Sequence, residues 1–123
     1  WDIIEGQGSI FHAAYAGVSL GLLHGSQPDA MILCAHAGRT HLELIPHIKH
    51  RPIQQAIDLH EQLARVTNPS AVVAGVSVNT STLENDDAAR DYLARIADAT
   101  GLPVTDPIRF GCGVLADALQ AIK

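Results

Sequence analysis

The stretch EGQGS, residues 5–9, brings together groups that can bind and transform a small ligand. An apolar run over residues 1–4 precedes it, and a buried parallel strand that ends in a functional loop has this pattern. Glu5 would then stand at the carboxyl end of the strand, where a metal or a polar substrate group can reach it. An ordinary strand-to-helix turn is the alternative. Three further residues of the loop can bind a ligand. Gln7 has a side-chain amide, Ser9 has a hydroxyl, and Gly8 lets backbone N–H groups approach a ligand closely.

Polar side chains also follow three later apolar runs, at the points where strands are expected to end. Carboxyl ends of parallel strands share one edge of a sheet, so these side chains should gather there. Arg39 adds a guanidinium fork suited to phosphate or carboxylate. The clusters are His36, Arg39 and His41; Asn79, Thr80, Ser81 and Thr82; and Asp106 with Arg109.

The elements that must position these groups alternate between strand and helix. Such alternation predicts the α/β class, a parallel sheet with helices on both faces. Gly17 and Gly21 suggest that the first helix presses closely against the sheet. A loop is expected over residues 36–51 and another from residue 106. Strands are predicted over residues 1–5, 29–35, 71–78 and 102–105, and helices over residues 12–25, 52–66, 85–99 and 114–122.

Length and composition narrow the class of protein. The 123 residues, 47% of them hydrophobic, suit one α/β domain over residues 1–123. Eight basic and 13 acidic residues are scattered, which argues against partners such as nucleic acid or a membrane surface. Cys34, in a strand expected to be buried, and Cys112 lack zinc spacing and read as reduced thiols of a cytoplasmic protein. Because Trp1 already lies in a predicted strand, we expect this chain to be the C-terminal part of a longer protein.

Several segments together resemble a known bacterial family: EGQGSIFHAAYAGVSLGLLHGSQPDAMIL, HAGRTH, ARVTNP, GVSVNTS and GLPVTDPIRFG. The chain is similar over its whole length to the carboxyl-terminal P-loop domain of a family of unknown function. Older labels call that family NAD-dependent epimerase/dehydratase, and some members are assigned as D-glutamate N-acetyltransferases. The resemblance implies a partial P-loop NTPase-like fold. Neither GxxxxGK[ST] nor a GxGxxG after a strand occurs here, so the phosphate loop is missing and the dehydrogenase label gains no support.

A more distant likeness is to dethiobiotin synthetase and the cobyrinic acid diamide synthases. In those enzymes a Glu before a glycine-rich turn holds magnesium, and an Asn after a valine-rich strand meets the adenine. By that likeness Glu5 would be the magnesium ligand, and Asn79 with Pro107 would lie near a base. One carboxylate suffices, because waters and phosphate oxygens complete the octahedron around magnesium.

The leading hypothesis is a small-molecule N-acyltransferase that acts on an acidic amino acid, D-glutamate by resemblance, with acetyl-CoA. Arg39 and Arg109 would clamp the substrate carboxylates. The base that deprotonates the substrate ammonium would be a histidine, with His41, His36 and His12 as equal alternatives. Further substrate or phosphate contacts would come from Gln7, Gly8, Ser9, Thr40, Asn79, Thr80, Asp106 and Pro107.

Three alternatives stay open. The first is a ligase or synthetase dependent on ATP and Mg²⁺, like dethiobiotin synthetase. The second is a metal site built from the imidazoles of His36, His41, His47 and His50, although their spacing matches no HExxH pattern. The third is a non-catalytic binding or assembly module. We expect residues 1–5 to leave an apolar sheet edge uncovered, which favours a homo-oligomer. We also expect this chain alone to be inactive, because the main phosphate cradle is missing.

Overall fold

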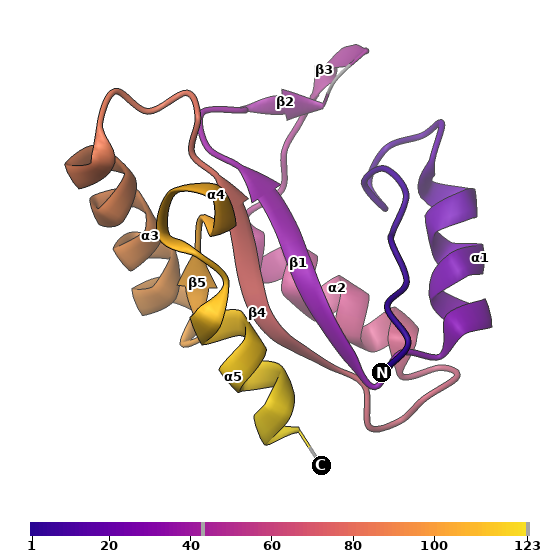
Figure 1. Cartoon of the computed structure of the whole chain (residues 1–123). Coiled ribbons are helices and arrows are strands. Elements are labelled where there is room, and N and C mark those ends of the chain that lie inside the picture. The colour runs from indigo at the N-terminus through magenta and orange to yellow at the C-terminus, as the bar shows by residue number, and fades with distance from the viewer. Residues whose placement is uncertain (43, 123) are drawn as a thin grey trace.

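A three-stranded parallel sheet organises the molecule. The structure is a computed structural model that describes residues 1–42 and 44–122. The sheet, here called sheet A, has the order β1-β4-β5 (Figure 1). Its strands are β1 (Ala30–His36), β4 (Val72–Asn79) and β5 (Val104–Thr105). The helices are α1 (Ala16–Ser26), α2 (Ile53–Ala64), α3 (Asp86–Thr100), α4 (Pro107–Phe110) and α5 (Gly113–Ala121).

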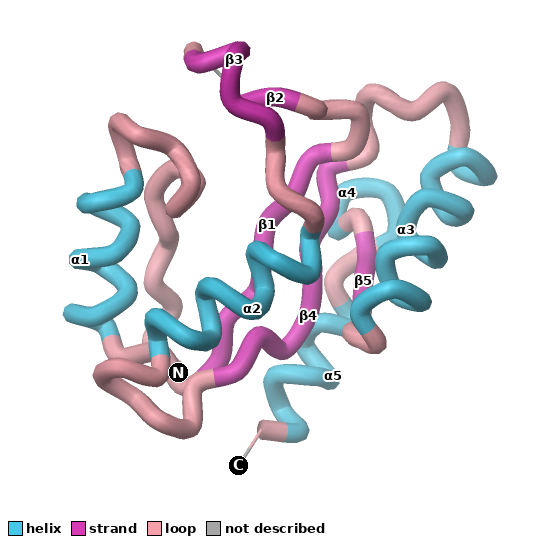
Figure 2. Tube along the Cα trace, turned by 180° about the vertical axis from the view of Figure 1, so that it is seen from behind, coloured by secondary structure: helices cyan, strands magenta, loops and turns pink. Residues whose placement is uncertain are grey.

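Helices cover both faces of sheet A, as the strand and helix alternation predicts. In Figure 1, α5 lies in front of β4 while α2 lies behind it, and Figure 2 shows α2 from the opposite side. α3 packs beside β5 and α2. The fold class predicted from the sequence is therefore confirmed: a parallel α/β sheet between two helical layers.

The core is centred on β4, the middle strand. Val76 and Val78 of this strand are fully buried, and Ile57 of α2 and Leu93 of α3 pack in the same cluster. A continuous Val-rich run suits this position because both faces of a central parallel strand are covered. β1 is different, because it has a strand on one side only. Cys34, expected to be buried, is exposed on it.

The boundaries of α3 follow from its capping residues. The side chain of Asn85 accepts a hydrogen bond from the backbone N–H of Ala88 (2.9 Å), and Asp86 and Asp87 occupy the first turn. Acidic side chains there favour the positive end of the helix dipole. Gly101 ends the helix with a φ of 68°, in the left-handed region that glycine adopts without strain. The predicted helix over residues 85–99 is thus confirmed to within a residue.

The predicted first strand over residues 1–5 is wrong in this structure. The segment is not assigned to a strand, and Trp1 and Ile3 are 86% and 94% exposed. It runs between α1 and β1 in Figures 1 and 2. No backbone hydrogen bond between described residues ties it to β1. An apolar run is stabilised as a strand only when a neighbouring strand pairs with it and a layer covers it.

Self-association through these exposed side chains stays a prediction, which light scattering would check.

The expectation that α1 presses on the sheet is also wrong. α1 has no buried residue, and a Cβ atom added at Gly17 or Gly21 would meet nothing within 4 Å. The helix packs instead against α2, where Nε2 of His24 lies 2.9 Å from the carbonyl oxygen of Leu63. Gly17 and Gly21 therefore make no close packing contact with other described residues.

Two segments expected to be loops contain regular structure. Residues 36–51 include an antiparallel hairpin of β2 (His41–Leu42) and β3 (Ile45–Lys49). Its strands are too short for the period-2 pattern to be recognised. Residues 107–110 form the single turn α4, because Asp106 caps it and Pro107 suits its first position.

Gly75 in β4 gives the first testable prediction. A Cβ atom at this position would lie 2.6 Å from Cδ2 of Leu115 and 2.9 Å from the backbone oxygen of Pro103. We expect Gly75→Ala to lower the free energy of unfolding by about 1–3 kcal/mol, since the backbone of β5 and helix α5 must shift. Denaturant unfolding would measure it.

The matched control is Gly21→Ala in α1, where the added methyl group meets open space. This variant should gain about 0.5–1 kcal/mol from the higher helix propensity of alanine. Equal stability of the Gly75→Ala variant and the wild type would contradict the packing described for β4.

Candidate functional site

The carboxyl ends of β1 and β4 meet at one edge of sheet A. The register pairs His36, the last residue of β1, with Asn79, the last residue of β4. One residue further on, the backbone N–H of Ala37 donates to the carbonyl oxygen of Asn79 (2.9 Å). The loops that follow the two strands are therefore joined where the sequence places their polar clusters.

The carbonyl oxygen of Ala37 is the centre of this junction. It accepts hydrogen bonds from Nδ1 of His36 (2.7 Å) and from the hydroxyl of Thr82 (2.9 Å). Gly38 follows with a φ of 78°, and a Cβ atom there would lie 3.3 Å from Oγ1 of Thr82. Glycine is thus required by both its backbone conformation and its close neighbour. Sequence reasoning did not single out Ala37 or Gly38, and the only signal was a glycine directly after a strand.

The three histidines predicted as possible bases lie in different environments. His36 is half-buried at the end of β1. His12 is 5% exposed, its Nδ1 accepts from the backbone N–H of Ala14 (3.1 Å), and its ring centroid lies 4.6 Å from that of Tyr15. His41 is exposed, with Nδ1 2.8 Å from the hydroxyl of Thr40. The hydrogen-bonding partners therefore distinguish three residues that the sequence left equal.

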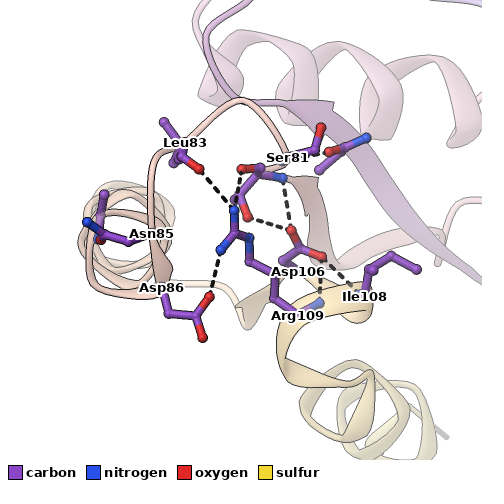
Figure 3. A network of polar contacts seen from close by, with 10 residues as sticks. Ser81, Leu83, Asn85, Asp86, Asp106, Ile108 and Arg109 are labelled. Atoms are coloured by element: carbon purple, nitrogen blue, oxygen red, sulfur yellow. Dashed lines mark hydrogen bonds and ion pairs between the residues drawn. The ribbon is translucent and has the colours of Figure 1, made fainter.

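Asp106 is buried at the end of β5, with 3% of its surface exposed (Figure 3). One carboxylate oxygen accepts from the backbone N–H and the hydroxyl of Thr80 (2.9 and 2.5 Å). The other accepts from the backbone N–H groups of Ile108 and Arg109 (2.9 and 3.1 Å). Burial raises the pKa of Asp106, but the hydrogen bonds from Thr80, Arg109 and Ile108 outweigh it, so the pKa lies below its ordinary value. The carboxylate is charged and fully occupied in holding two loops together.

Arg109 is likewise engaged by the protein. Figure 3 shows its guanidinium between the loop after β4 and the start of α3. Nη1 forms an ion pair with Asp86 (2.6 Å), and Nη2 donates to the carbonyl oxygens of Leu83 and Thr80 (3.0 and 3.4 Å). A substrate carboxylate at Arg109 would have to compete with Asp86. Arg39 lies in the loop after β1, next to the Ala37 junction, and is exposed.

The EGQGS loop is shaped mainly by α1. A Cβ atom at Gly8 would lie 2.6 Å from the ring of Tyr15, and the hydroxyl of Ser19 donates to the carbonyl oxygen of Gly8 (2.6 Å). Oγ of Ser9 accepts from the backbone N–H of Phe11 (3.2 Å). These contacts explain Gly8 and Ser9 without a ligand. Glu5, Gly6 and Gln7 are exposed.

The remaining predicted residues take these positions. Asn79 is exposed, and its side chain accepts from the backbone N–H of Ser81 (2.9 Å). Thr80 is fully buried against Asp106, whereas Thr40 is exposed beside His41. Pro107 occupies the first turn of α4. The exposed polar groups at the edge are thus those of the two loops after β1 and β4.

The hypothesis of a metal site in the histidine-rich loop is wrong. Within residues 1–42 and 44–122, no three His, Cys, Asp or Glu side chains form a group that could hold a metal ion. The imidazoles of His36, His41, His47 and His50 lie in that range and form no such group. A magnesium ion held by Glu5 with waters and phosphates would need no such group.

The fold and this edge define a parallel α/β domain with its polar loops at the carboxyl ends of the strands. Residues 1–116 match the family described as domain of unknown function (DUF1611_C) P-loop domain. The chain belongs to this family. As the resemblance implied, it is the C-terminal P-loop domain.

Relatives and a solved structure agree with this assignment. The chain is 43% identical over 122 residues to a D-glutamate N-acetyltransferase of Tritonibacter scottomollicae, covering 99% of this chain and 36% of that protein. It is 47% identical over 111 residues to a protein of the same name from a Pseudoalteromonas species, covering 90% and 33%. A crystal structure of a DUF1611 family protein from Anabaena variabilis matches with a TM-score of 0.88 at 38% identity, covering 94% of this chain and 34% of that one. The chain spans about a third of the length of these relatives.

No helix among the described residues combines the length and the apolarity that crossing a bilayer requires.

The Asp106 network gives the second prediction. Asp106→Asn replaces an acceptor with an NH₂ group that faces backbone donors, so at neutral pH the free energy of unfolding should fall by about 3 kcal/mol. The stabilisation by the charged form is complete above the ordinary aspartate pKa of about 3.9 and is lost as the pH falls through the lower pKa of the folded state. Unfolding measured from pH 7 to pH 2 should therefore show the two proteins converging in acid.

Asp91→Asn is the matched control, because Asp91 is exposed on α3. It should change stability by no more than about 0.5 kcal/mol. An Asp106→Asn variant as stable as this control at pH 7 would show that the buried carboxylate does not hold the loops.

Proposed function

We propose that the complete protein is an N-acetyltransferase that moves an acetyl group from acetyl-CoA to the amino group of a small acidic amino acid, D-glutamate. The observation that carries the proposal is the identity of 43% and 47% to two proteins named D-glutamate N-acetyltransferase, over 99% and 90% of this chain. Because the chain spans only about a third of those proteins, the activity is proposed for the complete protein.

The geometry of the sheet edge supports the acceptor side of this reaction. An acidic amino acid needs a cation for its carboxylates, polar groups that orient it and a base for its ammonium group. His36 ends β1 and the exposed Arg39 lies in the loop after it, and Asn79 at the end of β4 adds an exposed side chain. We assign the carboxylate clamp to Arg39, which is exposed in the loop directly after β1, in preference to the half-buried Arg109.

A ligase dependent on ATP and Mg²⁺ is the second candidate, and the family description as a P-loop domain favours it. Glu5 is exposed and can supply one carboxylate oxygen to magnesium, with phosphate oxygens and waters completing the shell.

One assay of the complete protein separates the two candidates. With acetyl-CoA and D-glutamate, we expect one free thiol for each N-acetylglutamate formed, with no need for ATP. Release of phosphate that requires Mg-ATP would contradict the acetyltransferase and favour the ligase. Absence of both reactions would favour a non-catalytic module.

Glu5→Gln tests the role of the loop after residue 4. The residue is exposed, so the free energy of unfolding should change by no more than about 0.5 kcal/mol. If Glu5 holds a cation at the ligand phosphates, loss of its charge at constant size should lower turnover at least about tenfold, within the usual range for an electrostatic contact. Asp2→Asn, a nearby exposed acid, is the control and should keep wild-type turnover. Full turnover of the Glu5→Gln variant would remove the metal role.

A further inference from the structure

We infer that the proton acceptor of the proposed transfer is Nε2 of His36, and not His12 or His41. The inference rests on the proposed function, because it names the base that an acetyl transfer to an ammonium group requires. The three histidines differ in which ring nitrogen already has a hydrogen-bonding partner in the protein.

The partner of His36 determines its tautomer. Nδ1 lies 2.7 Å from the carbonyl oxygen of Ala37. A carbonyl oxygen can only accept, so Nδ1 carries the proton. In the neutral ring the unprotonated nitrogen is then Nε2, the form that a general base needs.

Nε2 of His36 is also free to receive a proton. No described residue donates a hydrogen bond to it, and no described acid or base is paired with the ring. Every buried side-chain nitrogen or oxygen among the described residues has a partner, so an unpartnered Nε2 must reach solvent. The half-buried ring therefore presents its basic nitrogen to the outside of the sheet edge.

His12 has the opposite arrangement. Its Nδ1 accepts the backbone N–H of Ala14 at 3.1 Å, which leaves the proton of the neutral ring on Nε2. A buried imidazole whose acceptor nitrogen is occupied by a backbone donor cannot take a proton without losing that hydrogen bond. His12 is therefore a structural residue at the start of α1.

His41 is less well positioned than His36. It lies on β2 of the hairpin, outside sheet A, and is exposed. Its partner is the hydroxyl of Thr40, which can donate or accept and so leaves the tautomer undetermined.

The ring of His36 is held by a fixed acceptor. The hydroxyl of Thr82 also donates to the Ala37 carbonyl, and the backbone N–H of Ala37 donates to the carbonyl oxygen of Asn79. These bonds join both strand ends, so the carbonyl cannot turn away without breaking the junction. A base held in this way needs no reorganisation at the moment of proton transfer.

The substrate ammonium gives one proton to Nε2 of His36, and the freed amine attacks the thioester carbonyl of acetyl-CoA. The C–N bond forms, the C–S bond breaks, and the thiolate leaves with the electron pair. The nitrogen loses a second proton to the thiolate and keeps the third in the amide. The imidazolium returns its proton to water.

His36→Asn in the complete protein tests the role of the ring. The amide nitrogen of asparagine can replace Nδ1 as donor to Ala37, while the basic nitrogen is lost. We expect kcat to fall at least about 100-fold with KM little changed, the usual loss for a general base. Free imidazole added to the variant should restore part of the rate.

His60→Asn is the matched control. His60 on α2 also places Nδ1 2.7 Å from a carbonyl oxygen, that of Ala56, but lies away from the strand ends. It should keep wild-type kcat. Wild-type kcat in the His36→Asn variant would overturn the assignment. So would a fall in kcat of about 100-fold in the His41→Asn variant that His36→Asn does not show.

A second measurement does not depend on activity or on the folding of a variant. In ¹⁵N spectra of the complete wild-type protein with neutral imidazole rings, Nδ1 of His36 should show the protonated type of shift and Nε2 the unprotonated type. The reverse pattern would overturn the inference even if acetyl transfer is confirmed. Absence of acetyl transfer by the wild type would instead refute the proposed function, leaving the tautomer to be decided by the spectrum.

Discussion

The parallel pairing of β1 with β4 continues one residue beyond β1, where the N–H of Ala37 donates to the carbonyl oxygen of Asn79, the last residue of β4. That bond determines where both following loops begin. The carbonyl of Ala37 accepts from His36 at the end of β1 and from Thr82 in the loop after β4, so a side chain from each strand end or loop meets at one backbone atom. The arrangement of the candidate site follows from this shared acceptor.

Asp106 supports the same edge from the side of β5. A buried carboxylate is costly unless donors replace its water, and four donors from Thr80, Ile108 and Arg109 do so here. Arg109 then reaches back to the loop after β4 and to α3. Asp106 and Arg109 thus both make hydrogen bonds within the protein that join the loops after β4 and β5, while Arg39 and Asn79 are exposed at the same edge.

The sequence predicted the parts of the fold that local patterns determine. β4 is recognisable from its Val-rich run, and α3 from the Asn85 cap and Gly101. Residues 1–5 carry a strand-like pattern, but a strand depends on a paired neighbour that the pattern does not contain. The hairpin after β1 is too short to show a period.

The candidate site was predictable as a location but not in its chemistry. Chain direction in a parallel sheet brings His36 and Asn79 together, which sequence reasoning can foresee. Which nitrogen of His36 is protonated depends on a backbone carbonyl. That Asp106 and Arg109 hold loops depends on partners that sequence spacing does not reveal. Residue type alone therefore does not reveal which polar groups at the edge already bind other parts of the protein.

The central claim is that the acceptor substrate binds at the carboxyl edge of β1 and β4. A crystal structure of the complete protein with N-acetyl-D-glutamate tests it most directly. We predict a carboxylate of the product at Arg39 and its amide nitrogen within about 3 Å of Nε2 of His36, the reach of a general base. Product bound away from this edge, for example in the apolar groove that Val104, Val114 and Ala97 line between α3 and α5, would contradict the account.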